Sequence, residues 1–297
     1  MINKCIACHN KTKLFCKLPR KFYIFDIKEI PEYILYSYCP ACGTIQQNPI
    51  TSPKQLSKLV EKEYSNNTNK LIFNKKESDS HLPQHKVVVN TLKRYTINKD
   101  VLDVGAGTGN LCSMLLDKRV KCTGIDLSAK LVAYAKKRGL PIMQKNLKDI
   151  HSYRSYSAII MTHVFEHLAD SENTLKHINR LLKTKGLFIS VQPTAAMTNF
   201  LSRILRLNNL NSESPFSLAY LNLQPWHIII YSIQGMEIMA NRLGFKLIEV
   251  IPMPSVKNPG LIGFVRVCYN LFNKTGEKIF PQKWPFHVAH LFVFQKR

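Results

Sequence analysis

Four cysteines near the N-terminus have the spacing of a metal site. Cys5 and Cys8 form one Cys-x-x-Cys pair, and Cys39 and Cys42 form a second that Gly43 follows. Four thiolates in a tetrahedron suit zinc and leave no position open for a substrate. The glycine lets backbone amides turn toward a thiolate. We therefore expect a structural zinc site built from a small N-terminal ribbon.

A second group of residues has the pattern of a nucleotide-like cofactor site. Residues 103–109 read Asp-Val-Gly-Ala-Gly-Thr-Gly, and glycines at such a turn let the backbone approach a ligand closely. A dinucleotide loop would place its third glycine where Asn110 stands. Asp126 ends the next expected strand, where a carboxylate can accept hydrogen bonds from both ribose hydroxyls. The alternative is a glycine turn that only joins a strand to a helix.

Histidines follow in two places. His163 and His167 are four residues apart with Glu166 between them, so on a helical turn both imidazoles could bind a divalent metal. We favour the alternative, in which Glu166 and His167 form a hydrogen-bond network that holds the cofactor loop. His227 stands just before an expected helix. His227 and His167 are therefore candidate general bases, although a capping or core role for His227 fits the sequence equally well.

The glycine loop, Asp126 and the string Glu166-His167-Leu168 together resemble the class I S-adenosylmethionine-dependent methyltransferase superfamily over roughly residues 82–297. The resemblance implies a Rossmann-like seven-stranded sheet whose last strand is antiparallel, and an acceptor pocket faced by His227. It also implies a cofactor site for S-adenosylmethionine formed by Asp103, Gly105, Ala106, Gly107, Gly109, Asp126, Leu127, Asn146, Leu147 and His163. Many relatives carry Asp where this chain carries Asn146, whose amide oxygen can still accept from the adenine amino group. Ubiquinone-pathway O-methyltransferases resemble the 163–167 stretch and can use a divalent ion, but His163 replaces their first glutamate.

The stretch from Tyr38 to Pro49 resembles a narrower subfamily that joins a four-cysteine ribbon to a methyltransferase domain. Its members include sugar C-methyltransferases that act on nucleotide-linked deoxyketosugars, and proteins of surface-glycan pathways. The resemblance implies a small-molecule or glycan-precursor acceptor, either a sugar-nucleotide or a lipid-linked one. The sugar enzymes usually carry a further C-terminal domain for which this chain has no room, so the substrate itself does not follow.

The elements that must position these residues form three segments. Residues 1–48 form the zinc ribbon, with strands expected at Phe22–Ile27 and Tyr33–Tyr38, and residues 49–81 form a linker with a helix near Pro53–Tyr64. Residues 82–297 alternate helices and apolar runs, which indicates an α/β fold with a parallel sheet. In this third segment we expect strands near 100–104, 121–126, 141–144, 157–162, 186–191, 245–251 and 287–295, and helices near 82–95 and 231–243.

Two insertions, 193–230 and 252–286, should lie at the carboxyl edge of this sheet, where ligands bind in open α/β folds. Each contains an apolar stripe with helical spacing. The first stripe holds Met197, Phe200, Leu201 and Ile204, the second holds Leu261, Phe264, Val265, Cys268 and Phe272, and Arg203, Arg206 and Arg266 add charge. These segments are expected to cover a phosphate-bearing or lipid-linked acceptor, or alternatively to pack on the core.

The composition bears on whether the protein binds nucleic acid or a membrane. The net charge of +23 is spread along the chain rather than clustered, which fits a general shortage of acids at least as well as a phosphate-binding surface. An RNA methyltransferase that uses the ribbon to bind RNA is the alternative function. No apolar run is long enough for a membrane span, although contact with a membrane surface is compatible with the stripes. Met1–Cys16 has no signal-peptide pattern, so we expect a cytoplasmic protein with reduced thiols.

Overall fold

The computed structural model describes residues 4–19, 32–52, 55, 80–204, 223, 226–256, 260–280 and 284–297. The expected strand Phe22–Ile27 lies outside these ranges, as does nearly all of the expected helix near Pro53–Tyr64. Arg206 and the side chain of Arg203 are also outside them.

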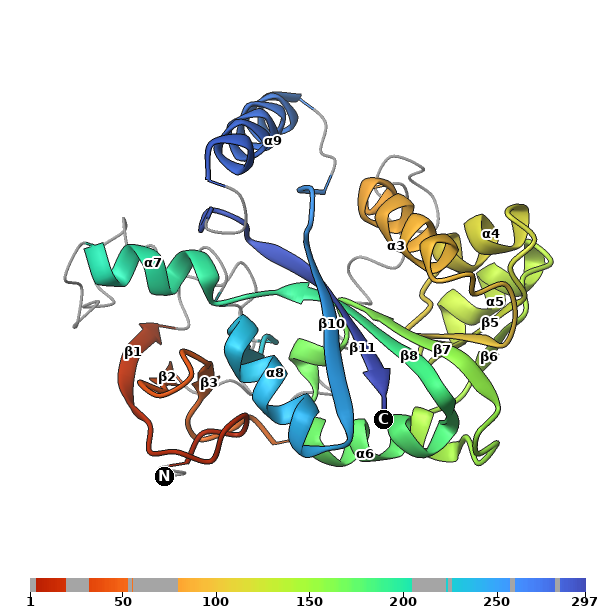
Figure 1. The fold of residues 1–297 in the computed structure, drawn as a ribbon, viewed down its shortest axis with the longest axis horizontal. Coiled ribbons are helices and arrows are strands. Elements are labelled where there is room, and N and C mark those ends of the chain that lie inside the picture. Colours follow the sequence, from red (N-terminus) through yellow and green to blue (C-terminus); the bar gives the residue numbers. More distant parts are fainter. Residues whose placement is uncertain are drawn as a thin grey trace.

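A large twisted sheet forms the centre of the molecule (Figure 1). Its strand order is β10-β11-β8-β7-β4-β5-β6. The parallel strands are β4 (Val101–Val104), β5 (Cys122–Asp126), β6 (Ile142–Gln144), β7 (Tyr156–Thr162) and β8 (Leu182–Pro193). The last strand, β11 (Ala289–Lys296), runs antiparallel between β8 and β10 (Phe245–Pro252). This arrangement confirms the expected Rossmann-like methyltransferase fold.

Helices cover both faces of this sheet. One face is covered by α3 (Leu82–Arg94), α4 (Asn110–Asp117) and α5 (Ala129–Lys137), and the other by α6 (Ser171–Leu181) and α8 (Ile233–Arg242). Neighbouring strand residues point to opposite faces: Leu102 and Ile159 join the core of the α6/α8 face, whereas Val101 and Ile160 join the core of the α3/α4/α5 face. Because both faces of the central strands are buried, their sequences are continuous apolar runs rather than alternating ones.

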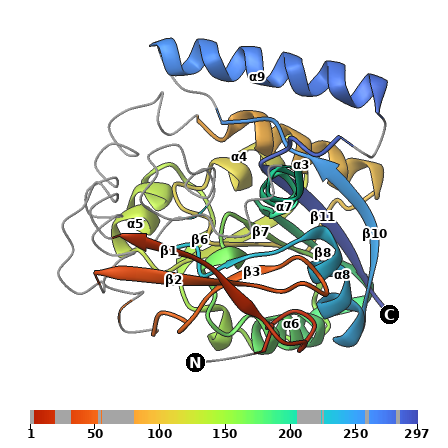
Figure 2. The ribbon, with the colours of Figure 1, turned by 90° about the vertical axis from the view of Figure 1, so that its left-hand side faces the viewer.

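Two further helices, α7 (Ala196–Ile204) and α9 (Gly260–Ile279), belong to the two insertions. Because Ala289 of β11 pairs with Pro193 of β8, both insertions leave the sheet at the carboxyl edge of the parallel strands, as expected. The second helix, α9, is the topmost element in both views (Figure 1 and Figure 2). Among the described residues, no helix combines the length and apolar character that a membrane crossing requires.

The N-terminal segment forms a second, four-stranded sheet of order β1-β2-β3-β9. It contains β1 (Lys13–Pro19), β2 (Tyr33–Tyr38) and β3 (Ile45–Gln47), so the expected strand Tyr33–Tyr38 is present. The fourth strand, β9 (Ile229–Ile230), comes from the first insertion of the large domain and pairs antiparallel with β3. The ribbon sheet is therefore completed by a distant part of the chain.

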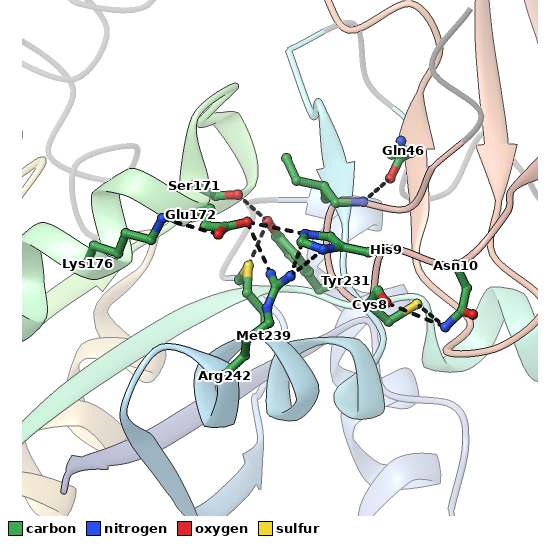
Figure 3. A network of polar contacts seen from close by, with 11 residues as sticks. Cys8, His9, Asn10, Gln46, Ser171, Glu172, Lys176, Tyr231, Met239 and Arg242 are labelled. Atoms are coloured by element: carbon green, nitrogen blue, oxygen red, sulfur yellow. Dashed lines mark hydrogen bonds and ion pairs between the residues drawn. The ribbon is translucent and has the colours of Figure 1, made fainter.

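Polar contacts also hold the ribbon against α6 and α8 (Figure 3). The Arg242 guanidinium of α8 lies 3.1 Å from Glu172 Oε2 of α6 and donates to His9 Nδ1 of the ribbon at 2.8 Å. Beneath them, the Tyr231 hydroxyl donates to Ser171 Oγ at 2.7 Å. The cysteine end of the ribbon thus sits on the large domain through both a shared core and a polar rim.

Candidate active site and metal centre

The glycine loop lies at the carboxyl end of β4, where three glycines have left-handed backbone conformations. Their φ angles are +75° for Gly105, +55° for Gly107 and +79° for Gly109, which only glycine adopts at little cost. A Cβ atom on Gly105 would lie 2.4 Å from Val164 Cγ2, so the loop packs against the exit of β7. A Cβ atom on Gly107 would meet nothing within 4 Å. The backbone at Gly107 therefore borders open space that a ligand can approach.

Asp126 ties this loop to the end of β5. Its carboxylate accepts hydrogen bonds from the Gly107 and Ser128 backbone N–H groups, each at 2.8 Å. Burial raises the pKa of Asp126 despite these bonds. Burial and the nearby Asp126 charge raise the pKa of Asp103 to about 7. Two buried carboxyls with raised pKa values, Asp103 and Asp126, thus stand beside the glycine loop. Shifted pKa values of this kind are typical of ligand sites.

Three further residues of the expected cofactor site, Leu127, Asn146 and Leu147, lie at the next strand ends. Leu127 follows Asp126 and is 68% exposed, so it is free to cover a ligand. Asn146 follows β6, and its side-chain oxygen accepts from the Lys148 N–H at 3.0 Å, capping the short helix Leu147–Asp149. Leu147 itself is buried. Asn146 therefore already has a structural role, and its contact with an adenine stays a prediction.

A fully buried carboxylate, Glu166, forms the centre of the histidine cluster. It lies in a single turn, Phe165–His167, that follows β7. His163 Nδ1 is 3.4 Å and His167 Nε2 is 3.9 Å from Glu166 Oε1. Burial alone would raise the pKa of Glu166, but His163, His167 and His227 outweigh it and bring this pKa to about 2. Glu166 is therefore an anion that depends on its histidine neighbours.

His163 is held between two oxygen acceptors. Its Nε2 atom lies 2.7 Å from Gln84 Oε1, and its Nδ1 atom faces Glu166. The Gln84 amide donates through Nε2 to the Pro254 carbonyl at 3.0 Å, which fixes the orientation of its oxygen. The doubly protonated ring is the form that donates to both acceptors. His163 also has a φ of +55° at the end of β7, an unusual conformation for a residue with a side chain.

His167 has a defined tautomer. Its Nδ1 atom lies 2.7 Å from the Trp226 carbonyl oxygen, so this nitrogen carries a hydrogen and donates. In the neutral ring, the lone pair is then on Nε2, which faces Glu166. The rings of His167 and His227 are 5.1 Å apart. The arrangement provides a proton acceptor whose charged form would be stabilised by the buried carboxylate.

His227 is positioned by the ribbon. Its carbonyl oxygen accepts from the Tyr36 hydroxyl at 3.2 Å and from Gln47 Nε2 at 3.4 Å. The next residue, Ile228, donates its N–H to the Glu166 carbonyl at 2.9 Å. Ligand atoms of Glu166, His167 and His227 come within 4.8 Å of one another. Sequence spacing suggested His163 and His167 as a pair, whereas the fold groups His167 with His227.

Sequence reasoning missed three residues that support this cluster: Gln84, Tyr36 and Gln47. Gln84 lies in the first turn of α3, and Tyr36 and Gln47 lie on neighbouring ribbon strands. All three are buried polar side chains, which need hydrogen-bond partners. No local spacing links them to residues 163–227, so the sequence carries no signal for their role.

The four N-terminal cysteines converge on one point. Cys5 Sγ lies 3.6 Å from Cys42 Sγ, and Cys8 Sγ lies 3.4 Å from Cys39 Sγ, with all four sulfurs within 4.8 Å of one another. A tetrahedron of 2.3 Å Zn–S bonds places its sulfurs about 3.8 Å apart. The Cys5 thiol and burial act in opposite directions on Cys42, and the net effect lowers the pKa of Cys42 to about 5. All four are free thiols. The site therefore fits zinc.

The chain matches a known family over most of its length. The family described as "Methyltransferase domain" matches residues 56–250. A malonyl-[acyl-carrier protein] O-methyltransferase of Acetivibrio thermocellus is 26% identical over 125 residues, which is 38% of this chain and 44% of that protein. A protein of Geobacillus sp. (strain WCH70) that is described as a methyltransferase is 28% identical over 102 residues, which is 31% of this chain and 41% of that protein. The chain thus spans less than half the length of these curated relatives.

Solved structures share the fold. A 1,6-didemethyltoxoflavin-N1-methyltransferase of Burkholderia thailandensis, with bound 1,6-didemethyltoxoflavin and S-adenosylhomocysteine, is similar with a TM-score of 0.54 and 13% identity. The similarity covers 92% of this chain and 97% of that one. A magnesium protoporphyrin IX methyltransferase of Synechocystis PCC 6803 is similar with a TM-score of 0.52 and 15% identity, covering 81% of this chain and all (100%) of that one. At these identities the likeness establishes the fold alone.

The family match, the fold and the glycine loop together define an enzyme of the S-adenosylmethionine-dependent methyltransferase class. The family match over residues 56–250 then places the chain plainly: it belongs to the methyltransferase-domain family.

Proposed function

We propose that this enzyme methylates a small molecule or a glycan precursor, such as a sugar-nucleotide or a lipid-linked sugar. The observation that carries this proposal is the Glu166–His167–His227 cluster. It follows β7 at the same sheet edge as the glycine loop, and Gly105 packs directly against Val164 next to it. The named relatives act on a malonyl-acyl-carrier protein, a porphyrin and a toxoflavin precursor, so small acceptors suit this fold.

The residues at the ends of β4 and β5 fit S-adenosylmethionine. Gly107 offers open space beside its backbone, and Asp126 offers a carboxylate for ribose hydroxyls. We assign Asp103, Gly105, Ala106, Gly109, Leu127, Asn146, Leu147 and His163 to the walls of the same site. The sulfonium of this cofactor supplies an activated methyl group. The protein has to align the acceptor atom and keep water away.

We assign the proton acceptor to His167 and His227. The Trp226 carbonyl holds His167 with its Nε2 lone pair toward the cluster, and Glu166 stabilises the positive charge that arrives with a proton. Such a base assists transfer to a hydroxyl or to an acidic carbon. His163 takes a different part: its ring lies between Glu166 and Gln84 and links the loop after β7 to α3.

We assign the four cysteines to a structural zinc ion in a ribbon that spans 1–48, with a linker over 49–81 and the methyltransferase domain over 82–297. Four thiolates complete the coordination of zinc, so this centre supports the fold and takes no part in methyl transfer. We place the enzyme in the cytoplasm, where such thiols stay reduced.

Single-site variants with separate binding and turnover measurements test the proposed base. His167→Ala and His227→Ala should each bind S-adenosylmethionine as the wild type does but lose about 10²-fold or more in methyl transfer. S-adenosylhomocysteine release is measured with nucleotide sugars, lipid-linked sugars and structured RNA as acceptors. Transfer to RNA alone, with binding that falls steeply as salt rises, would establish the RNA methyltransferase alternative instead. Full activity in both variants would remove the cluster from catalysis.

A further inference from the structure

Helix α9 is attached to the protein by its polar side. Four residues spaced three or four apart face the body: Arg266, Asn270, Asn273 and Glu277. Arg266 donates to the Val256 carbonyl at 3.1 Å, and Asn270 Oδ1 accepts from both the N–H and the hydroxyl of Ser255, at 3.1 and 3.0 Å. Asn273 Oδ1 accepts from Trp284 Nε1 at 2.8 Å, and Glu277 Oε1 lies 2.9 Å from His287 Nε2.

The opposite side of α9 is apolar and faces outward. Phe264, Val267 and Leu271 continue with helical spacing into Lys274 and Lys278, and the three apolar side chains are 65%, 55% and 59% exposed. Val265 and Ile279 widen this face and are 57% and 63% exposed. An amphipathic helix on a water-soluble surface has the reverse orientation, with its apolar stripe against the core. Exposed apolar patches of this kind mark interaction sites.

Charge identifies the partner that this face fits. The exposed face carries Lys274 and Lys278, and the one acidic residue of the helix, Glu277, is turned inward to His287. Helix α9 itself carries three basic residues, Arg266, Lys274 and Lys278, and the single acidic residue Glu277, a net charge of +2. Large apolar side chains bordered by lysines are typical of helices that lie in the interface of an anionic membrane. Lysine stems can also bury while their ammonium groups reach the lipid phosphates.

We propose that α9 docks this enzyme on an anionic phospholipid surface through Phe264, Val267, Leu271, Lys274 and Lys278. Trp284 and Phe286 back the helix: their rings pack against Phe272, and Gly276 lets Trp284 approach the helix closely. These aromatic contacts and the polar contacts above hold the helix from one side. Docking through α9 does not depend on the identity of the proposed acceptor. The insertion that contains α9 leaves the sheet at its carboxyl edge, where a lipid-linked sugar would be received.

Flotation with vesicles tests the docking. Wild-type protein should bind vesicles of phosphatidylcholine and phosphatidylglycerol, and bind vesicles of phosphatidylcholine alone at least about tenfold more weakly. Lys274→Glu with Lys278→Glu, and separately Phe264→Asn with Leu271→Asn, should each lower binding to the mixed vesicles at least about tenfold. Lys136→Glu with Lys137→Glu on α5 makes the same change in charge at another exposed helix and should leave binding near wild type.

Cys268 provides a second readout, because its exposed thiol lies on the same face as Phe264 and Leu271. An environment-sensitive dye on Cys268 should shift its emission to the blue when mixed vesicles are added. The proposal is wrong if wild-type protein ignores the mixed vesicles, if the α9 variants bind them like wild type, or if the dye does not respond. A wild-type dimer that Phe264→Asn with Leu271→Asn dissociates, without vesicle binding, would show that a second copy covers this face. Circular dichroism and S-adenosylmethionine binding verify that each variant is folded.

Discussion

Asp126 orders the glycine loop and is also the carboxylate that we propose as the ribose ligand. It already orders the glycine loop by accepting the Gly107 N–H, and the proposed cofactor site adds the ribose hydroxyls to the same carboxylate. Hydrogen bonds to a charged group contribute about 1.5–3 kcal/mol each. The loop and the ligand therefore depend on the same carboxylate.

The first prediction follows from this double function. Asp126→Ala should weaken S-adenosylmethionine binding at least about a hundredfold while the protein stays folded. Isothermal titration calorimetry measures the affinity, and Asp117→Ala, which removes an exposed carboxylate at the far end of α4, is the matched control. Wild-type affinity in Asp126→Ala would show that the cofactor binds elsewhere.

The second prediction concerns Asp103 and pH. Burial and the Asp126 charge raise its pKa to about 7 in the folded protein, whereas an unfolded chain has a value near 3.8. Between these values the native state binds the proton and the unfolded state does not, so the contribution of Asp103 to stability falls as pH rises from about 4 to 7. Melting temperatures of the cofactor-free protein should therefore drop less over this range in Asp103→Asn than in wild type. Parallel curves for the two proteins would contradict the raised pKa.

At the scale of elements, the sequence predicted those strands whose limits are set by neighbouring residues. The strands Val101–Val104 and Cys122–Asp126 are short apolar runs bounded by glycine or a helix cap, and they lie within a residue or two of their expected bounds. Strand β9 could not be predicted in this way, because Ile229 and Ile230 form a strand only through pairing with β3, far away in sequence. The same long-range pairing brings His227 to Glu166. Spacing along the chain therefore suggested His163 as the neighbour of His167 and gave no signal for His227.

The ribbon strands should consequently affect methyl transfer, which is the third prediction. Tyr36 and Gln47 hold the His227 carbonyl, and the Tyr36 hydroxyl also accepts from Gln47. Tyr36→Phe removes one such bond without changing the bulk of a fully buried ring, so kcat should fall up to about tenfold while S-adenosylmethionine affinity is unchanged. Tyr33→Phe, on the same strand but exposed, is the control. An equal loss of kcat in Tyr36→Phe and Tyr33→Phe would show that the effect comes from lower overall stability.

At the scale of the whole molecule, the ribbon and the methyltransferase domain share a core. Cys5, Cys39 and Cys42 belong to the same buried cluster as Tyr231 and Met236, and the Ser232 hydroxyl donates to the Cys42 carbonyl while capping α8. The boundaries proposed from sequence at residues 48 and 81 separate the segments in sequence. In space, however, the end of the ribbon sheet is a strand from the large domain. We therefore expect that loss of the proposed zinc ion would disturb the Glu166–His167–His227 cluster.

The fourth prediction is that zinc stabilises the entire chain. Elemental analysis should find one zinc per chain in the wild type and none in Cys39→Ser with Cys42→Ser, whereas Cys268→Ser, an exposed thiol outside the cluster, should keep the metal. Because four thiolates bound to zinc contribute folding free energy, the double variant should melt several degrees lower in one cooperative transition. Its methyl transfer should fall with the displaced β9 and His227. Two separate transitions would instead show that the domains fold independently, and zinc retained by the double variant would assign the metal to Glu166, His167 and His227.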